Sequence, residues 1–324
     1  MSFFLLSVVF KHVFRFYVSF LLSYFFVYLC SFIYMTLKEL QKHIFQCTST
    51  FLEKGEAHVI TDMLIKHFTD YDKLYVNLNP QTEISTIIIE RIFRAIEQLA
   101  KNEPIQYVLG ESVFCGLKFI VNQSVLIPRP ETEELCMWVI EENKFANKII
   151  DICTGSGCIA VSLAKNIKNC DVYAVDISPD TLKIANENAL LNNVKVNFMQ
   201  YDIFDSNFMQ SIDIKFDVIV SNPPYVREME KSFMDKRVLD YEPHIALFVE
   251  DENPLLFYDT VLKFGQTHLK NNAKLYFEIN ENLSKEVVAL FAKYGYNDIY
   301  IKEDIHGKNR MICGRMNLKY NLLN

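Results

Sequence analysis

Residues 148–160 read KIIDICTGSGCIA, and this stretch decides the fold. Its first five residues form a short apolar run that predicts a buried strand, and its last residues begin a helix. Between them, Gly155 and Gly157 permit a tight turn and the close approach of a ligand to the backbone. Cys153 and Ala160 depart from the dinucleotide pattern G-x-G-x-x-G, and the lysine of a P-loop is missing. The turn therefore suits a ligand with amino-acid and ribose moieties better than a phosphate, unless it is only an ordinary connection.

Strand and helix patterns alternate from this segment to the end of the chain, which is typical of a mostly parallel sheet. Helices are expected between most of the strands, for example over 178–192 and 254–269. The fold class predicted is α/β, with a Rossmann-like sheet of seven strands. These strands are expected near 148–152, 171–175, 194–199, 216–221, 273–279, 297–302 and 310–315.

The preceding part of the chain has a helical period. Apolar residues recur at helical spacing in three groups, with a loop at 77–80. Strand-like text follows over 107–122, where Gly110 and Gly116 suggest a hairpin. We therefore divide the chain into an apolar segment (1–34), a helical domain (35–104), a hairpin linker (105–130) and the α/β domain (131–324). The three helical groups are Leu37, Leu40 and Ile44, then Ala57, Ile60, Leu64 and Phe68, then Ile88, Ile92, Ile96 and Leu99.

The N-terminal segment allows three interpretations. Residues 16–37 carry no charged side chain, and a membrane-spanning helix needs only about 20 apolar residues. Lys11 and Arg15 would keep the N-terminal side of such an anchor in the cytoplasm. Alternatively, Met35 begins a natural amphipathic helix, so that residues 1–34 stem from a misassigned start. The third interpretation is a packed helix.

Composition restricts the partners and the compartment. The formal net charge is −7, which argues against a general electrostatic grip on nucleic acid. The eight cysteines form no C-x-x-C pair and match no zinc spacing. Scattered thiols in a chain of this size favour a reducing, cytoplasmic compartment, with no metal site and no disulfides expected.

Two further strands end in acidic residues. Asp176 follows the apolar run at 172–175, where a carboxylate can accept hydrogen bonds from both hydroxyls of a ribose. Asp202 follows the next strand and could accept from an exocyclic adenine amine, while Ile203 packs on the ring. Each aspartate could instead only cap the helix that follows it.

Asn222-Pro223-Pro224-Tyr225 follows the apolar run at 216–221. Two prolines cannot continue a ladder, so the strand stops and presents Asn222 at the carboxyl edge of the sheet, where ligands bind. The Asn222 side-chain oxygen and the Pro223 carbonyl are two acceptors that can hold both hydrogens of a planar NH2 group. The alternative is that the motif is only a turn.

This order of a glycine turn, two acidic strand ends and NPPY resembles the class I S-adenosylmethionine-dependent methyltransferases. Within them, the chain over about residues 35–316 resembles the PrmC/HemK family of protein-(glutamine-N5) methyltransferases. The stretch PRPETE at 128–133 is the most specific motif of this resemblance, because general methyltransferases lack it. The other motifs that support the resemblance are EPIQYVLG at 103–110, LI at 126–127, CTGSG at 153–157, NPPY at 222–225, YEP at 241–243 and AL at 246–247.

The resemblance implies an enzyme that uses S-adenosylmethionine to methylate the side-chain amide nitrogen of a glutamine in peptide chain release factors, within a Gly-Gly-Gln loop. It implies that residues 35–104 dock this protein substrate. In the catalytic site, Asn222 and Pro223 grip the glutamine amide, Pro224 and Tyr225 pack around it, and Glu242 shapes the pocket. The cofactor site comprises Cys153, Thr154, Gly155, Ser156, Gly157, Asp176, Asp202, Ile203 and Asn222.

The chain departs from the family pattern at three places. Glycine is frequent at the position of Cys153, so a cysteine predicts a backbone outside the left-handed region there. An aromatic residue often occupies the position of Ile203, so adenine stacking is expected to be weaker. Residues 248–254 replace a glycine-rich variant.

Two rival functions remain open on the sequence. A DNA or RNA adenine-N6 methyltransferase also has to hold an exocyclic NH2 and uses a similar motif, but it usually adds a basic target-recognition region and flips the base out. A protein that binds the cofactor without turnover is the other rival, and the intact NPPY motif argues against it.

Overall fold

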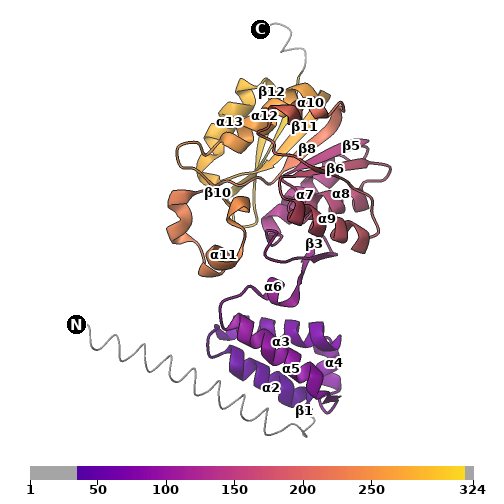
Figure 1. The fold of residues 1–324 in the computed structure, drawn as a ribbon, viewed down its shortest axis with the longest axis vertical. Coiled ribbons are helices and arrows are strands. Elements are labelled where there is room, and N and C mark those ends of the chain that lie inside the picture. Colours follow the sequence, from indigo (N-terminus) through magenta and orange to yellow (C-terminus); the bar gives the residue numbers. More distant parts are fainter. Residues whose placement is uncertain (1–34, 318–324) are drawn as a thin grey trace, which may run out of the picture. The chain divides into compact units, whose positions relative to one another are not determined.

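The computed structural model describes residues 35–317 and divides the chain into two compact units, which meet between Leu109 and Gly110. Figure 1 shows the helical unit in indigo to purple and the α/β unit in the remaining colours. The three interpretations of residues 1–34 lie outside the described residues. Among the described residues, no helix is long and apolar enough to cross a bilayer.

The first unit is a small helical bundle, as its apolar period predicts. Leu37, Leu40 and Ile44 are fully buried, and a Thr36–Glu39 capping box begins the first helix. One difference is local, because a short helix extends into the loop expected at 77–80. The elements are β1 (Met35–Thr36), α2 (Leu37–Thr48), α3 (Lys54–Thr69), α4 (Lys73–Leu78), β2 (Glu83–Ile84) and α5 (Thr86–Leu99).

The structure corrects the prediction of a strand at residues 107–110. The structure forms a helix there, α6 (Ile105–Leu109), which follows Pro104 and ends before Gly110 at a φ of 70°. Ile105, Val108 and Leu109 pack against the core of the helical bundle. Their spacing of three and four residues is helical, and burial on that core outweighs the β propensity of the short run.

The hairpin predicted around Gly116 is confirmed. Strands β3 (Glu111–Phe114) and β4 (Leu117–Ile120) pair antiparallel through a two-residue turn at Cys115 and Gly116. Both turn residues have positive φ, 48° and 71°, which a two-residue type I′ hairpin requires.

The α/β unit is built on a seven-stranded sheet with the order β12-β13-β11-β8-β5-β6-β7. All strands run parallel except β13, which is antiparallel to both of its neighbours. The predicted strands are all present, although their ends shift by up to four residues. The strands are β5 (Lys148–Ile152), β6 (Asp171–Asp176), β7 (Asn197–Gln200), β8 (Phe216–Ser221), β11 (Leu269–Glu278), β12 (Tyr296–Glu303) and β13 (Asn309–Met316).

Helices cover both faces of this sheet, because successive strand residues point to opposite sides. Ile149 belongs to the core cluster under α7, α8 and α9, whereas its neighbour Ile150 belongs to the cluster under α10, α12 and α13. Figure 1 shows these two helical layers. The helices are α7 (Pro130–Glu142), α8 (Cys158–Asn166), α9 (Pro179–Leu191), α10 (Ser206–Ser211), α12 (Leu256–His268) and α13 (Ser284–Lys293).

A long insertion follows β8 and returns to the sheet at α12. Its two short strands pair parallel to each other outside the main sheet. It contains β9 (Val226–Arg227), the 3₁₀ helix η1 (Glu228–Phe233), α11 (Lys236–Tyr241), the 3₁₀ helix η2 (His244–Ala246) and β10 (Phe248–Val249).

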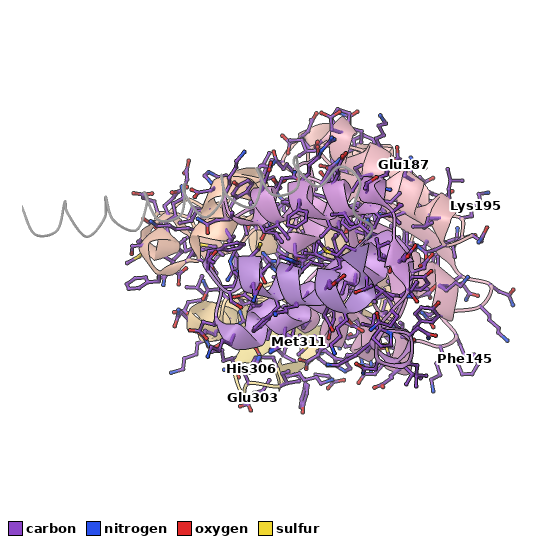
Figure 2. The ribbon with its side chains drawn as sticks, turned by 90° about the horizontal axis from the view of Figure 1, so that it is seen from below. Phe145, Glu187, Lys195, Glu303, His306 and Met311 are labelled. Atoms are coloured by element: carbon purple, nitrogen blue, oxygen red, sulfur yellow. The ribbon has the colours of Figure 1, made fainter. Side chains whose placement is uncertain are left out.

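The turn between β12 and β13 is braced by a buried carboxylate. Asp304 accepts hydrogen bonds from the backbone N–H groups of His306 and Lys308, and from the Arg310 guanidinium at 3.2 Å. Figure 2 labels Glu303, which ends β12, and His306, which lies in this turn. A further 3₁₀ helix, η3 (Glu281–Leu283), follows β11.

Candidate active site

Four neighbouring parallel strands end at the same edge of the sheet, and each contributes predicted site residues. β5 leads into the glycine turn, β6 ends at Asp176, β7 precedes Asp202, and β8 precedes Asn222. The sequence elements that lie apart in the chain are therefore brought to one edge, at the carboxyl ends of the strands.

The glycine turn uses left-handed backbone at three positions. The φ angles are 62° at Cys153, 55° at Gly155 and 78° at Gly157. The expectation that Cys153 avoids this region is therefore wrong, because the turn geometry is retained and the cysteine adopts it. At Gly157 a Cβ atom would lie 3.1 Å from the Cβ of Ala185, so this glycine also allows α8 and α9 to pack closely.

Asp151 supports the turn from inside the sheet and was not among the predicted site residues. It is fully buried, and its Oδ2 accepts hydrogen bonds from the Thr154 hydroxyl at 2.6 Å and the Ala160 N–H at 3.2 Å. The Oδ1 atom of Asp151 has no hydrogen-bond partner among the described residues. Burial raises the pKa of this carboxyl to about 7. A charge inside the apolar run KIIDI was the sequence signal for it.

Asp176 links the glycine turn to the neighbouring strand end. Its Oδ2 accepts from the Gly155 N–H at 3.0 Å, and its Oδ1 accepts from the Ser178 N–H at 3.1 Å. Burial raises the pKa of this carboxyl, although these backbone hydrogen bonds act in the opposite direction. The carboxylate keeps unused lone pairs, and the side chain is only half-buried. It can therefore accept hydroxyl protons of a ligand as well.

The third strand end differs in part from the expectation. Asp202 is exposed, and its Oδ1 accepts from the Phe204 N–H at 2.9 Å, so it also shapes its own turn. Ile203 is 7% exposed and packs in the core, which leaves little of its surface for a ligand. Phe204 is 44% exposed and makes an edge contact with Phe257.

Asn222 lies at the edge of a small cavity of about 50 Å³. Its side-chain Nδ2 donates to the Thr132 hydroxyl at 2.9 Å. No described residue donates a hydrogen bond to the Asn222 Oδ1 or to the Pro223 carbonyl. The corner thus keeps two oxygen acceptors for a ligand. Apolar side chains form much of the cavity, including Leu126, Pro223, Tyr225, Val226, Ala246 and Leu247.

Two buried residues behind this corner were missed as site residues by the sequence analysis. Thr132 on α7 donates to Glu278 Oε2 at 2.6 Å, and the Tyr225 hydroxyl donates to Glu278 Oε1 at 2.8 Å. Burial raises the pKa of Glu278, while these two hydrogen bonds and the charge of Arg310 lower it. The sequence signal for Glu278 was an acidic residue closing the apolar strand LYFE.

Glu242 shapes the cavity indirectly. It is buried and forms an ion pair with Arg129, whose NH2 group lies 2.5 Å from Glu242 Oε1. Glu242 Oε2 also accepts from the Ile127 N–H at 3.1 Å. Arg129 lines the cavity whereas Glu242 does not. The YEP and PRPETE motifs therefore meet in one ion pair that holds the cavity wall.

Comparison with known proteins shows the family of this chain. The methyltransferase small domain family matches residues 132–240, and the PrmC N-terminal domain family matches residues 44–110. A release factor glutamine methyltransferase from Flavobacterium psychrophilum is 43% identical over 86% of this chain and 98% of its own length. One from Bacteroides thetaiotaomicron is 40% identical over 79% of this chain and 92% of its own length.

The chain belongs to the release factor glutamine methyltransferase family. This membership confirms the resemblance drawn from the motifs. The fold confirms the predicted class as well, a Rossmann-like methyltransferase sheet with a helical unit before it.

S-adenosylmethionine is the cofactor of a methyltransferase of this kind, and the residues present fit it. The turn at 153–157 exposes backbone rather than a lysine, which suits an amino-acid moiety. Asp176 offers carboxylate lone pairs of the kind that bind a ribose diol. The donor and acceptor chemistry of the glycine turn and the acidic strand ends therefore matches the cofactor that the family implies.

Proposed function

We propose that this protein transfers a methyl group from S-adenosylmethionine to the side-chain amide nitrogen of the glutamine in the Gly-Gly-Gln loop of peptide chain release factors. Family membership supports this reaction, since relatives that match nearly end to end are named for it. The structural observation that carries it is the Asn222 corner, where two oxygen acceptors border a small apolar cavity.

The chemistry demands positioning above all. An amide nitrogen is a poor nucleophile because its lone pair is delocalised, and no carboxylate can remove its proton first. Orientation alone can lower a barrier by roughly 7–11 kcal/mol. Asn222 Oδ1 and the Pro223 carbonyl accept the two N–H bonds of the glutamine, which fixes the plane of the amide and the direction of its nitrogen.

When bound, S-adenosylmethionine supplies a methyl group on a cationic sulfur that becomes a neutral thioether. Because charge disperses during transfer, a dry and weakly polar cavity favours the transition state. Tyr225 and the apolar cavity wall exclude water. Once the nitrogen has gained the methyl carbon, it loses one N–H proton along its hydrogen bond to an acceptor oxygen of the corner, and the proton passes to solvent when the site opens, so that the product is a neutral N-methyl amide.

The other predicted site residues bind the cofactor. Thr154, Ser156, Gly155 and Gly157 hold the cofactor with Cys153 through the turn backbone, while Asp176 binds the ribose. Asp202 and Ile203 border the adenine, and Ile203 contributes less than expected because it is largely covered. Asn222 also contacts the cofactor at the methyl end.

The helical domain at 35–104 docks the release factor, and α6 extends it to Leu109. The match of the PrmC N-terminal domain family to residues 44–110 supports a specialised role for this unit. Release factors work on the ribosome, so this function requires a cytoplasmic protein, and it requires no nucleic-acid partner of its own.

The direct test is incubation of the purified protein with methyl-labelled cofactor and a bacterial release factor, followed by peptide mapping. We expect one labelled methyl on the glutamine of the Gly-Gly-Gln loop. A release factor with that glutamine replaced by alanine is the matched control and should remain unlabelled. Label on another residue, or equal label on the control, would refute the proposal.

A further inference from the structure

The Asn222 side chain is one end of a buried hydrogen-bond chain with a fixed direction. Asn222 Nδ2 donates to Thr132 Oγ1, Thr132 donates to Glu278 Oε2, and Tyr225 donates to Glu278 Oε1. Thr132 is 3% exposed and Glu278 is 2% exposed, so water does not substitute for these partners.

The fold brings these side chains together from three elements. β8 and β11 pair in parallel with Ser221 opposite Phe277, so the residues that follow, Asn222 and Glu278, lie beside each other at the sheet edge. Thr132 reaches both from the first turn of α7. The PRPETE and NPPY motifs are therefore joined directly, by Asn222 and Thr132, and a second time through Glu278, which neither motif contains.

The direction of the chain follows from proton counting. The count takes Glu278 as ionised, since its Oε2 and Oε1 each lie against a hydroxyl donor. An ionised carboxylate only accepts, and each oxygen of Glu278 takes one donor. The single hydroxyl proton of Thr132 is committed to Glu278, so the Thr132 oxygen can only accept from its other neighbour. Asn222 must therefore turn its NH2 group toward Thr132, and its Oδ1 must face the cavity.

A rotated Asn222 amide would place two oxygens against each other with no proton between them. It would also present an NH2 group to the NH2 group of the substrate. We propose that Thr132 and Glu278 are positioning residues that hold the Asn222 oxygen toward the glutamine amide. This inference rests on the proposed function and names the residues that orient its central acceptor.

Thr132→Val and Thr132→Ser form the matched pair of variants. Valine keeps the shape and removes the hydroxyl, so the amide of Asn222 loses its orientation. We expect kcat to fall about 10- to 100-fold, with the KM for the release factor little changed because docking lies elsewhere. Serine keeps the hydroxyl and should retain activity near that of the wild type.

A second pair tests the direction of the chain itself. In Asn222→Asp, two carboxylates compete for the one Thr132 proton, so activity should fall. Adding Glu278→Gln lets the glutamine NH2 donate to Thr132, which can then donate to the introduced aspartate and leave the other oxygen of that carboxylate free. We expect the double variant to be about tenfold more active than Asn222→Asp alone.

The readouts separate this inference from the proposed function and from folding. Methylation of the release factor by the wild type tests the function, whereas the variants test the chain. Cofactor binding by equilibrium dialysis and thermal unfolding verify that each variant is folded. Equal kcat in Thr132→Val and Thr132→Ser, or a double variant no better than Asn222→Asp, would overturn the inference.

Discussion

At the scale of single residues, Cys153 shows that the glycine turn imposes its geometry on whatever residue occupies it. A side chain in the left-handed region costs about 1–2 kcal/mol because the Cβ approaches the following carbonyl oxygen. The cysteine tolerates a φ of 62° with its partly buried side chain packed against the core cluster that contains Ile150.

We therefore expect an inverted order of stability for two small substitutions at this position. In the middle of a helix or strand, a protein with glycine is less stable than one with alanine by about 0.5–1 kcal/mol. At residue 153, Cys153→Gly should be more stable than Cys153→Ala by about 1 kcal/mol, since both lose the sulfur and only alanine keeps the strain. Urea unfolding of the two variants measures the difference, and a less stable glycine variant would contradict the strained turn.

Asp151 makes stability depend on pH. The pKa of Asp151 rises from 3.8 in the unfolded chain to about 7 in the fold. Between these pH values the carboxyl is therefore protonated to a greater extent in the folded state than in the unfolded state. The free energy of unfolding should therefore fall as pH rises through this window, by up to about 1.4 kcal/mol per pH unit. Asp151→Asn should reduce that slope, and the part that remains comes from Asp176 and Glu278, whose pKa values are raised by burial as well.

Urea unfolding between about pH 4.5 and 7 measures the slope, because the window follows from the raised pKa. Asp213→Asn, at an exposed carboxyl between α10 and β8, is the control and should leave the slope unchanged. A slope in Asp151→Asn as steep as that of the wild type would show that Asp151 does not contribute to it.

At the scale of elements, α9 fastens the hairpin to the glycine turn. Asn188 is fully buried, accepts from the Ile120 N–H at 2.6 Å, and donates to the Ile120 and Ser156 carbonyls at 3.0 and 2.9 Å. A single side chain thus connects β4 to the cofactor turn.

Asn188→Ala should lower the free energy of unfolding by about 3 kcal/mol, since one buried backbone group, at Ser156, and two partly buried ones, at Ile120, lose their partner. It should also weaken cofactor binding by loosening the turn at Ser156. Asn166→Ala is the control, because Asn166 makes one hydrogen bond within its own helix, to the Ser162 carbonyl, and should cost less than about 1 kcal/mol. Chemical unfolding and dialysis check both effects, and similar losses in the two variants would contradict the clamp.

The sequence predicted the types of these elements better than their ends. The alternation of strand and helix patterns was enough for the seven strands, because most of them carry an apolar run. It failed at residues 107–110, where burial of Val108 and Leu109 on the helical bundle decides the structure. Local propensity contains no information about such a partner surface.

The same limit applies to the candidate site. Asn222 and Asp176 were visible because they interrupt apolar runs at strand ends. Thr132 and Glu278 were not, because their significance comes from the strand register that places Glu278 beside Asn222. A pairing of residues 146 positions apart follows from the topology rather than from any local pattern.

At the scale of the whole molecule, the negative charge separates the proposed reaction from methylation of nucleic acid. The formal net charge of −7 argues against a general electrostatic grip on phosphates. We expect that excess DNA or RNA leaves the rate of release-factor methylation unchanged, and that neither polymer gains a methyl group on adenine. Inhibition by nucleic acid at low salt would contradict this expectation.

The measurement that tests the account most directly is the single-turnover rate of release-factor methylation by Asn222→Ala. Loss of the acceptor that fixes the glutamine amide should lower this rate about 100- to 1,000-fold. Cofactor affinity should fall by less than about tenfold, since the proposed cofactor site has most of its contacts at the glycine turn and Asp176. An Asn222→Ala protein that methylates the same glutamine at the wild-type rate would contradict the account.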